Sequence, residues 1–313
     1  MVGENAGSQL TERREALSAT INFGDVSGKA IVIESLLVAV TRVSTFLADK
    51  PLTGATGFFF ERAGRLYLVT SRHVVLDEAS NHRPDRLEIE LHVDPKNIAV
   101  VTQMSIPLYR GNQPVWRQGV DSGGNVDIVA VELQRTALPQ TILLSTFTPD
   151  HLVTEFDQIE IGAPVLIVGF PLGFHDNLHH LPVARQAAIA SAFGIRFQGQ
   201  GYFLTDASMH RGTSGAPVVA RMTTHRSGRG DLAWMLLGVH AARLDVSNRD
   251  VNEDERLNLN CAWYADILLT LTDEIAVTPE KSGNVNLSPA KQGAMKCAPT
   301  GPIPFPRFPQ ARL

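Results

Sequence analysis

Residues 205–218, which read TDASMHRGTSGAPV, narrow the possible structures of this chain more than any other stretch. Ser214 stands between Gly212 and Gly215, so the backbone can turn tightly there and bring its N–H groups close to whatever the hydroxyl contacts. A serine hydroxyl is a poor nucleophile until a base takes its proton and a third group orients that base. If Ser214 is a nucleophile, the chain must therefore also supply a histidine and a carboxylate.

Two polar residues interrupt apolar runs that are typical of strands. His73 follows the run LYLVTSR at residues 66–72, and Asp127 opens the run DIVAVEL at residues 127–133. A lone charge at such a position would be costly, so each residue is expected to have a polar partner. The chain order His, Asp, Ser is that of the chymotrypsin type and the reverse of the α/β-hydrolase type.

The pattern of apolar residues predicts an all-β protein. From residue 30 onward, short apolar runs are separated by Gly, Pro, Asn and Asp, as in barrels and sandwiches. Residues 266–272 instead favour a short helix near the end of this region. The expected strands cover residues 54–60, 66 to the turn at His73, 87–93, 98–106, 127–133, 162–171, 185–192, 201–206, 216–220, 234–241 and 260–265.

Four motifs, TSRHV at 70–74, DIVAV at 127–131, GFPLG at 169–173 and TDA…GTSGAP at 205–217, resemble those of trypsin/chymotrypsin-like serine proteases of the PA clan. The similarity is nearest to the bacterial HtrA-like and glutamyl-endopeptidase-like branch and covers roughly residues 30–272. It implies two six-stranded antiparallel β-barrels of the chymotrypsin type with a short C-terminal helix.

The resemblance and the composition together predict four segments. Residues 276–313 are rich in proline and poor in periodic apolar residues, so we expect a disordered tail there. The segments are an N-terminal extension at 1–28, a first barrel at 29–145 with His73 and Asp127, a second barrel at 146–275 with Ser214 and the closing helix, and the tail.

The resemblance implies a catalytic triad. His73 would act as general base and then as general acid, and Asp127 would hold its imidazole in the useful tautomer. The N–H groups of Gly212 and Ser214 would form the oxyanion hole. The chain would then be a serine endopeptidase that hydrolyses peptide bonds through an acyl-enzyme, with a polypeptide as its substrate.

Control of such an enzyme would differ from that of the zymogen-activated trypsins. Thr213 stands where those proteases carry an aspartate that pairs with a newly cut N-terminus. Without that carboxylate, activation by insertion of the N-terminus is not expected. Loop ordering, an activating protein partner or a ligand remain as means of control.

The resemblance also indicates the walls of a specificity pocket, at Ser208 and Met209 on one side and at His240, Ala241 and Arg243 on the other. Ser208 in place of an aspartate argues against cleavage after Lys or Arg. His240 occupies the position where glutamyl endopeptidases read an acidic side chain, which favours cleavage after Glu or Asp. Met209 replaces the hydroxyl residue of those enzymes, so cleavage after small or medium apolar residues, as in HtrA-like proteases, agrees with the sequence at least as well.

Composition limits the partners and the compartment. The chain has 313 residues, 44% of them hydrophobic, and a formal net charge of −4, which argues against nucleic acid as the main partner. The apolar residues 30–40 are interrupted by Glu34 and are too short to span a bilayer, so no membrane is expected. Two cysteines, Cys261 and Cys297, and the polar residues 1–8 without signal-peptide character favour a cytoplasmic protein.

Three histidines, His175, His179 and His180, follow the GFPLG motif without a cysteine or a clear fourth ligand, so we expect neither a metal site nor a cofactor. Two other functions are alternatives to an active protease. A catalytically silent protease fold could bind peptides in its cleft. An esterase of the α/β-hydrolase kind is disfavoured by the chain order and by Ala216, which stands where its motif needs a glycine.

Overall fold

The structure, a computed structural model, describes residues 23–24, 30–31, 33–121, 124–222, 232–243 and 258–274. The predicted tail and Cys297 lie outside these residues, as does most of the predicted N-terminal extension. Within the described part, two large antiparallel sheets are accompanied by two small two-stranded sheets, β1 (Phe23–Gly24) with β2 (Ala30–Ile31) and β8 (Tyr109–Arg110) with β9 (Gln113–Pro114).

The first large sheet has seven strands in the order β10-β11-β5-β4-β3-β6-β7. Its strands β4 and β5 are joined at Ala63 and Gly64, whose φ angles of 50° and 76° suit the tight turn of a twisted hairpin. The strands of this sheet are β3 (Val40–Leu47), β4 (Lys50–Arg62), β5 (Arg65–Thr70), β6 (Arg86–His92), β7 (Val101–Pro107), β10 (Trp116–Asp121) and β11 (Gly124–Leu133).

The second large sheet has six strands in the order β13-β12-β15-β16-β17-β14. Its two edge strands meet just beyond β13, where Ile189 bridges to Thr205 and the Ala190 N–H donates to the carbonyl of Leu204 over 2.8 Å. The strands are β12 (Pro164–Gly169), β13 (Val183–Ala188), β14 (Tyr202–Thr205), β15 (Pro217–Arg221), β16 (Trp234–Arg243) and β17 (Asn260–Tyr264).

Side chains that alternate along β5 belong to two different cores. Leu66 and Leu68 pack in a cluster within the first sheet, whereas Tyr67 and Val69 pack in a cluster that also contains Val239 of β16. Successive strand residues point to opposite faces, so one face of β5 serves the first sheet alone. The other face contributes to a core that the two large sheets share.

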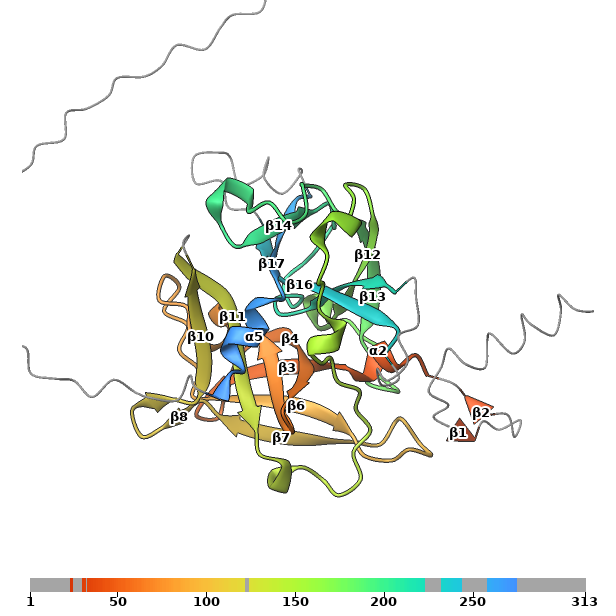
Figure 1. The fold of residues 1–313 in the computed structure, drawn as a ribbon. Coiled ribbons are helices and arrows are strands. Elements are labelled where there is room, and N and C mark those ends of the chain that lie inside the picture. The colour runs from red at the N-terminus through yellow and green to blue at the C-terminus, as the bar shows by residue number, and fades with distance from the viewer. Residues whose placement is uncertain are drawn as a thin grey trace, which may run out of the picture. The chain divides into compact units, whose positions relative to one another are not determined.

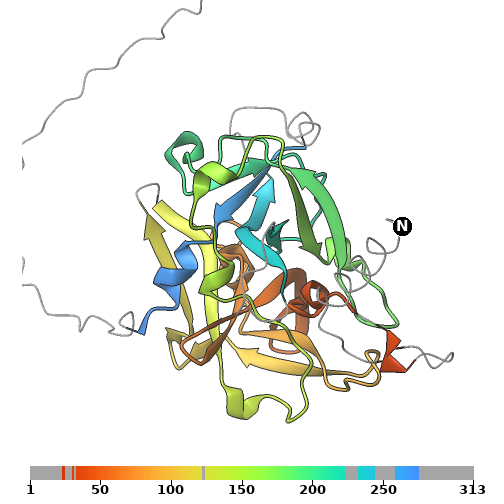
Figure 2. The same cartoon turned by 45° about the vertical axis from the view of Figure 1, so that its right-hand side comes forward.

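Short helices connect and close the sheets. The predicted C-terminal helix is α5 (Ile267–Leu271), and it lies beside β10 and β11 of the first sheet in both ribbon views (Figures 1 and 2). Its buried Leu268 and Leu271 join the shared core. The others are α2 (Ser35–Val38), α3 (Arg72–Val75), η1 (Arg135–Ala137), η2 (Pro149–His151), η3 (Phe156–Gln158), η4 (Pro171–Gly173) and η5 (Phe197–Gly199).

The prediction of an all-β fold with antiparallel sheets and a short C-terminal helix is confirmed. The first sheet differs from it by having seven strands where six were expected. Two of its strands lie outside the expected ranges: the interior strand β3, which pairs with β4 and β6, and the edge strand β10, in which Trp116 pairs with Val131 of β11. The polar residues of β10, whose sequence is WRQGVD, hide this strand from a search for apolar runs.

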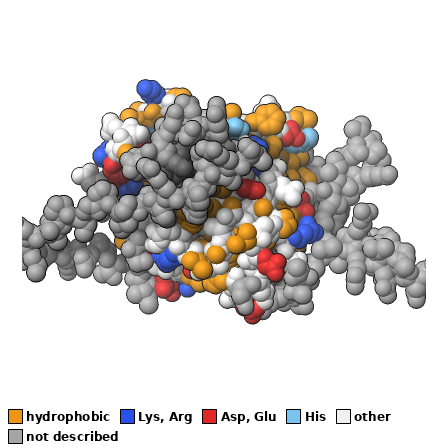
Figure 3. Space-filling model, turned by 90° about the horizontal axis from the view of Figure 1, so that it is seen from above, with side chains coloured by type: hydrophobic (Ala, Val, Ile, Leu, Met, Phe, Trp, Pro, Cys, Tyr) orange, Lys and Arg blue, Asp and Glu red, His pale blue; other side chains and the backbone are white. Residues whose placement is uncertain are grey.

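The described surface carries charges of both signs. On the face seen in Figure 3, acidic and basic side chains are interspersed, with hydrophobic side chains between them. Among the helices of the described residues, none combines the length and the apolar character needed to cross a lipid bilayer.

Candidate active site

His73 and Asp127 form a pair. His73 lies on α3, directly after β5, and the register that pairs Thr70 with Val129 of β11 sets Asp127 beside this turn. The Nδ1 atom of His73 is 2.7 Å from Oδ2 of Asp127, and the backbone N–H of His73 donates to Oδ1 over 2.9 Å. Both carboxylate oxygens therefore orient the histidine.

The protonation of His73 depends on two opposing effects. Burial of the ring lowers its pKa. The hydrogen bond and the charge of Asp127 outweigh this effect, with a contribution from Asp77, so the pKa of His73 lies above its ordinary value of 6.5. A histidine of this kind can take up and return a proton near neutral pH.

The turn that carries Ser214 lies between β14 and β15 and is held from both large sheets. The carbonyl of Ser214 accepts the N–H of Thr56 on β4 over 2.9 Å, and the N–H of Gly215 donates to the carbonyl of His240 on β16 over 2.8 Å. Gly215 has a φ of 86°, and a Cβ there would collide with the Thr56 carbonyl oxygen. The close approach of β4 therefore requires a glycine after the serine.

The amide groups around Ser214 divide into two sets. Those of Thr213, Gly215 and Ala216 donate to backbone carbonyls. Within the part of the chain that the structure describes, the N–H groups of Gly212 and Ser214 have no acceptor. Two unpaired donors next to a serine hydroxyl can stabilise negative charge that develops on a reacting carbonyl oxygen.

Thr56 connects this turn with its surroundings. Its buried Oγ1 donates to the carbonyl of Gly212 over 2.7 Å and accepts the N–H of Phe170 over 3.1 Å. Its carbonyl oxygen accepts the Thr70 hydroxyl over 2.7 Å. Sequence reasoning missed Thr56 because Gly212 lies 156 residues further along the chain, and nothing local marks such a partner.

The turns of His73 and Ser214 share a backbone contact. The hydroxyl of Ser71 donates to the carbonyl of His240 over 3.3 Å, and this carbonyl also accepts the Gly215 N–H. The structure thus brings the two turns to one point of β16. Among the described residues, however, no hydrogen bond joins the Ser214 hydroxyl to the His73 imidazole.

The residues predicted to line a specificity pocket differ in exposure. Ser208 is exposed, whereas Met209 and Ala241 are buried, and the side chain of Arg243 lies outside the described part. His240 is only 2% exposed, and its Nδ1 has no partner among the described residues. Burial, together with the charge of His73, lowers the pKa of His240 to about 4, so the ring is neutral at pH 7.

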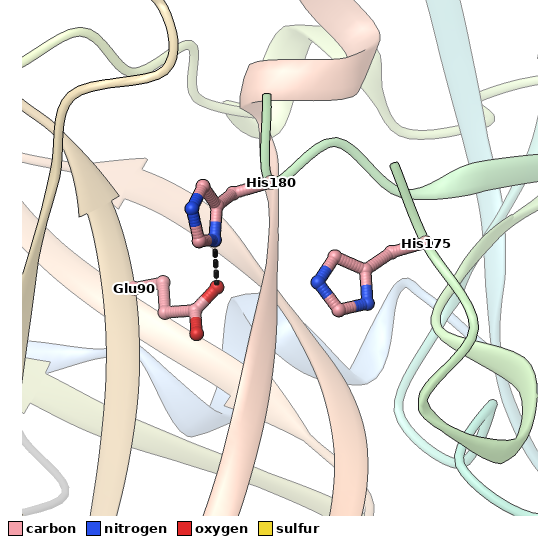
Figure 4. Close-up of side chains that lie close together, drawn as sticks. All are labelled: Glu90, His175 and His180. Atoms are coloured by element: carbon pink, nitrogen blue, oxygen red, sulfur yellow. Dashed lines mark hydrogen bonds and ion pairs between the residues drawn. The ribbon is translucent and has the colours of Figure 1, made fainter. Parts of the chain in front are cut away.

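A second group of titratable residues lies apart from this site. His175 and His180 come together with Glu90 of β6, and one ligand atom of each lies within 4.8 Å of the other two (Figure 4). The predicted absence of a metal site rested on the histidines alone. Glu90 was missed because it is brought to them only by the packing of β6 against the loop after β12.

The described residues thus form two large antiparallel sheets, with the His73–Asp127 pair and the glycine-flanked Ser214 on turns that meet at the carbonyl of His240. The model of the trypsin-like peptidase domain matches residues 55–224, more than half of the chain. The protein therefore belongs to the trypsin-like peptidase family.

Two solved structures are similar to this chain. The serine endoprotease from Yersinia pestis aligns with a TM-score of 0.43 and 14% identity, over 75% of this chain and 62% of that one. The Rv3671c protease from M. tuberculosis in its active form aligns with a TM-score of 0.43 and 17% identity, over 78% and 83%. This chain thus spans less than two thirds of the Yersinia protein. A comparison with the curated proteins gives no match.

The substitution Thr56→Val tests the role of the Thr56 hydroxyl. It leaves the Gly212 carbonyl and the Phe170 N–H without their partner, and we expect the free energy of unfolding to fall by about 2 kcal/mol or more. Thr56→Ser keeps the hydroxyl and should cost only about 1 kcal/mol. Urea unfolding of both variants measures the difference, and equal losses would contradict it.

The substitution Asp127→Asn tests the cause of the raised pKa of His73. Without the carboxylate, burial dominates, so the titration midpoint of the ring should fall from above 6.5 to below it. NMR titration of the His73 ring protons measures the shift, and an unchanged midpoint would contradict the assignment. Because the folded-state pKa is raised, the stability that it contributes is complete below the unfolded pKa and is lost as pH rises through the folded value.

Proposed function

We propose that this protein is a serine endopeptidase that hydrolyses polypeptides through an acyl-enzyme, with His73, Asp127 and Ser214 as its catalytic triad. The observation that carries the proposal is the pair of unpaired N–H groups at Gly212 and Ser214, next to a hydroxyl whose neighbouring turn holds the His73–Asp127 pair. Two free backbone donors at a serine hydroxyl are what the stabilisation of a negatively charged intermediate requires.

The reaction would use the groups in sequence. Neutral His73 takes the proton of Ser214 as the hydroxyl attacks the substrate carbonyl, and Asp127 stabilises the imidazolium that forms. The N–H groups of Gly212 and Ser214 hold the negative oxygen of the tetrahedral intermediate. His73 then passes the proton to the leaving amine, and water hydrolyses the acyl-enzyme by the same route.

A catalytically silent peptide-binding module is the second candidate. It is favoured by the missing hydrogen bond between Ser214 and His73 in the described structure. Such bonds are often long in free enzymes and tighten when substrate binds, so the observation is also compatible with an enzyme. Chemical reactivity of Ser214 separates the two.

We propose that the protein cleaves its substrate after acidic residues, with Glu or Asp before the scissile bond. His240 supports this proposal, because its Nδ1 atom has no partner among the described residues and, when it carries the proton, can donate a hydrogen bond to a carboxylate. A buried polar atom of this kind needs a hydrogen-bond partner, which a substrate carboxylate or a water molecule can supply. Small apolar residues are the alternative, since Met209, a buried apolar residue, belongs to the same predicted pocket.

Control by a protein partner or by loop ordering is part of the proposal. Thr213 supports it, because its hydroxyl donates to the carbonyl of His210 over 2.6 Å and offers no negative charge for a new N-terminus.

We also propose a reducing compartment, such as the cytoplasm. Cys261 is a free thiol, and burial raises its pKa to about 12, which makes it unreactive.

Labelling with a fluorophosphonate probe tests the proposed function. The probe should modify the wild-type protein at Ser214, as read by mass spectrometry, and should not modify Ser214→Ala. His73→Ala should slow labelling by at least about 100-fold, because it removes the general base.

Circular dichroism of each variant controls for folding. A folded wild-type protein that stays unlabelled both alone and in cell lysate, where a partner could activate it, would support the binding module. Labelling that is indifferent to His73 would contradict the triad.

Cleavage of a peptide library tests the proposed specificity. We expect Glu or Asp before the scissile bond, and His240→Gln should lower kcat/KM for these peptides by more than about tenfold while cleavage after Ala or Val changes less. If the protein instead prefers small apolar residues, and His240→Gln leaves this preference unchanged, the proposed cleavage after Glu or Asp is contradicted.

A further inference from the structure

The loop between β12 and β13 carries two histidines toward the first sheet. It folds back on itself where Asp176 pairs with Leu181 in an isolated β-bridge. His175 directly precedes Asp176, and His180 directly precedes Leu181. Figure 4 shows the two imidazoles beside each other and the carboxylate of Glu90 next to His180. Glu90 belongs to β6, so the cluster joins the loop between β12 and β13 to a strand of the first sheet.

We propose that Glu90, His175 and His180 bind a divalent transition-metal ion, with zinc as the best match. One ligand atom from each residue lies within 4.8 Å of the others. Two imidazoles and a carboxylate form a set that zinc accepts, with a fourth position for water. Calcium and magnesium prefer oxygen ligands, so the two imidazoles argue against them.

The distances agree with this choice. A tetrahedral zinc ion with bonds of about 2.0–2.2 Å sets its ligand atoms about 3.3 Å apart. Nδ1 of His180 and Oε2 of Glu90 already lie 3.2 Å apart. All three ligand atoms lie within 4.8 Å of one another, so a further approach of at most about 1.5 Å is needed, which side-chain rotation on a loop can supply.

His175 is oriented by contacts that suit a metal ligand. Its Nδ1 lies 2.6 Å from the carbonyl oxygen of Gly173, to which it donates, so the lone pair of Nε2 is left for an ion. The ring of Phe170 packs against it with centroids 5.7 Å apart. Metal-binding histidines commonly donate their other N–H to a carbonyl or carboxylate in this way.

His179 differs from its neighbours and provides a control. Its Nδ1 lies 2.7 Å from Oδ2 of Asp176, and its side chain is 40% exposed. Oδ1 of the same carboxylate accepts the backbone N–H groups of Leu178 and His179. His179 therefore serves the turn of the loop, and its ring is not part of the cluster.

Zinc binding by the full chain tests the proposal. The Ser214→Ala background excludes self-cleavage, and the readouts are zinc per chain after dialysis, by plasma mass spectrometry, and the shift of Tm on adding zinc. We expect one bound zinc and a raised Tm, both retained in His179→Ala. His175→Ala, His180→Ala and Glu90→Gln should each abolish the Tm shift and lower zinc affinity by more than about 100-fold. This is more than the loss of a residue that only hydrogen-bonds to a ligand usually costs.

Two results would overturn the proposal. One is the absence of zinc binding by the folded Ser214→Ala protein. The other is binding that survives His175→Ala and His180→Ala but disappears in His73→Ala, which would assign the ion to the His73–Asp127 pair. Circular dichroism checks the fold of every variant, and His175→Asn and His180→Asn replace any alanine variant that fails to fold.

Discussion

The structure depends on the hydrogen bonds of one buried threonine, Thr56 of β4. Its N–H donates to the carbonyl of Ser214, its hydroxyl joins Gly212 and Phe170, and its carbonyl accepts the hydroxyl of Thr70. Leaving any of these buried groups without a partner would cost about 1–3 kcal/mol. The position of the Ser214 turn relative to the first sheet is therefore set by buried polar groups that need hydrogen-bond partners.

Glycine makes this close packing possible. A side chain at Gly212 would collide with the carbonyl oxygen of Phe170, and one at Gly215 would collide with that of Thr56. Both residues also have positive φ angles, of 96° and 86°. The backbone conformation that leaves two amides unpaired beside Ser214 is thus available only because neither position carries a Cβ.

The loop after β12 is hydrogen-bonded to the turn that carries Ser214. The N–H of Leu172 donates to the carbonyl of Arg211, the residue before Gly212, and Phe170 is bound to Thr56. His175 and His180 follow on this loop and face Glu90 of the first sheet. The loop that carries His175 and His180 is therefore hydrogen-bonded, at its beginning, to the turn that carries Ser214.

The sequence by itself determined the fold class, the strands with strong apolar runs and the candidate triad, because period-two alternation, glycine flanks and a polar residue at a strand end are local signals. It did not reveal the strands β3 and β10, the role of Thr56 or the approach of Glu90 to His175 and His180. Only the tertiary structure decided these, and also which amides near Ser214 stay unpaired. Strand register and sheet packing bring such residues together although they are far apart in the sequence. The local sequence indicates on which face of a strand a side chain lies, but not which residue it contacts there.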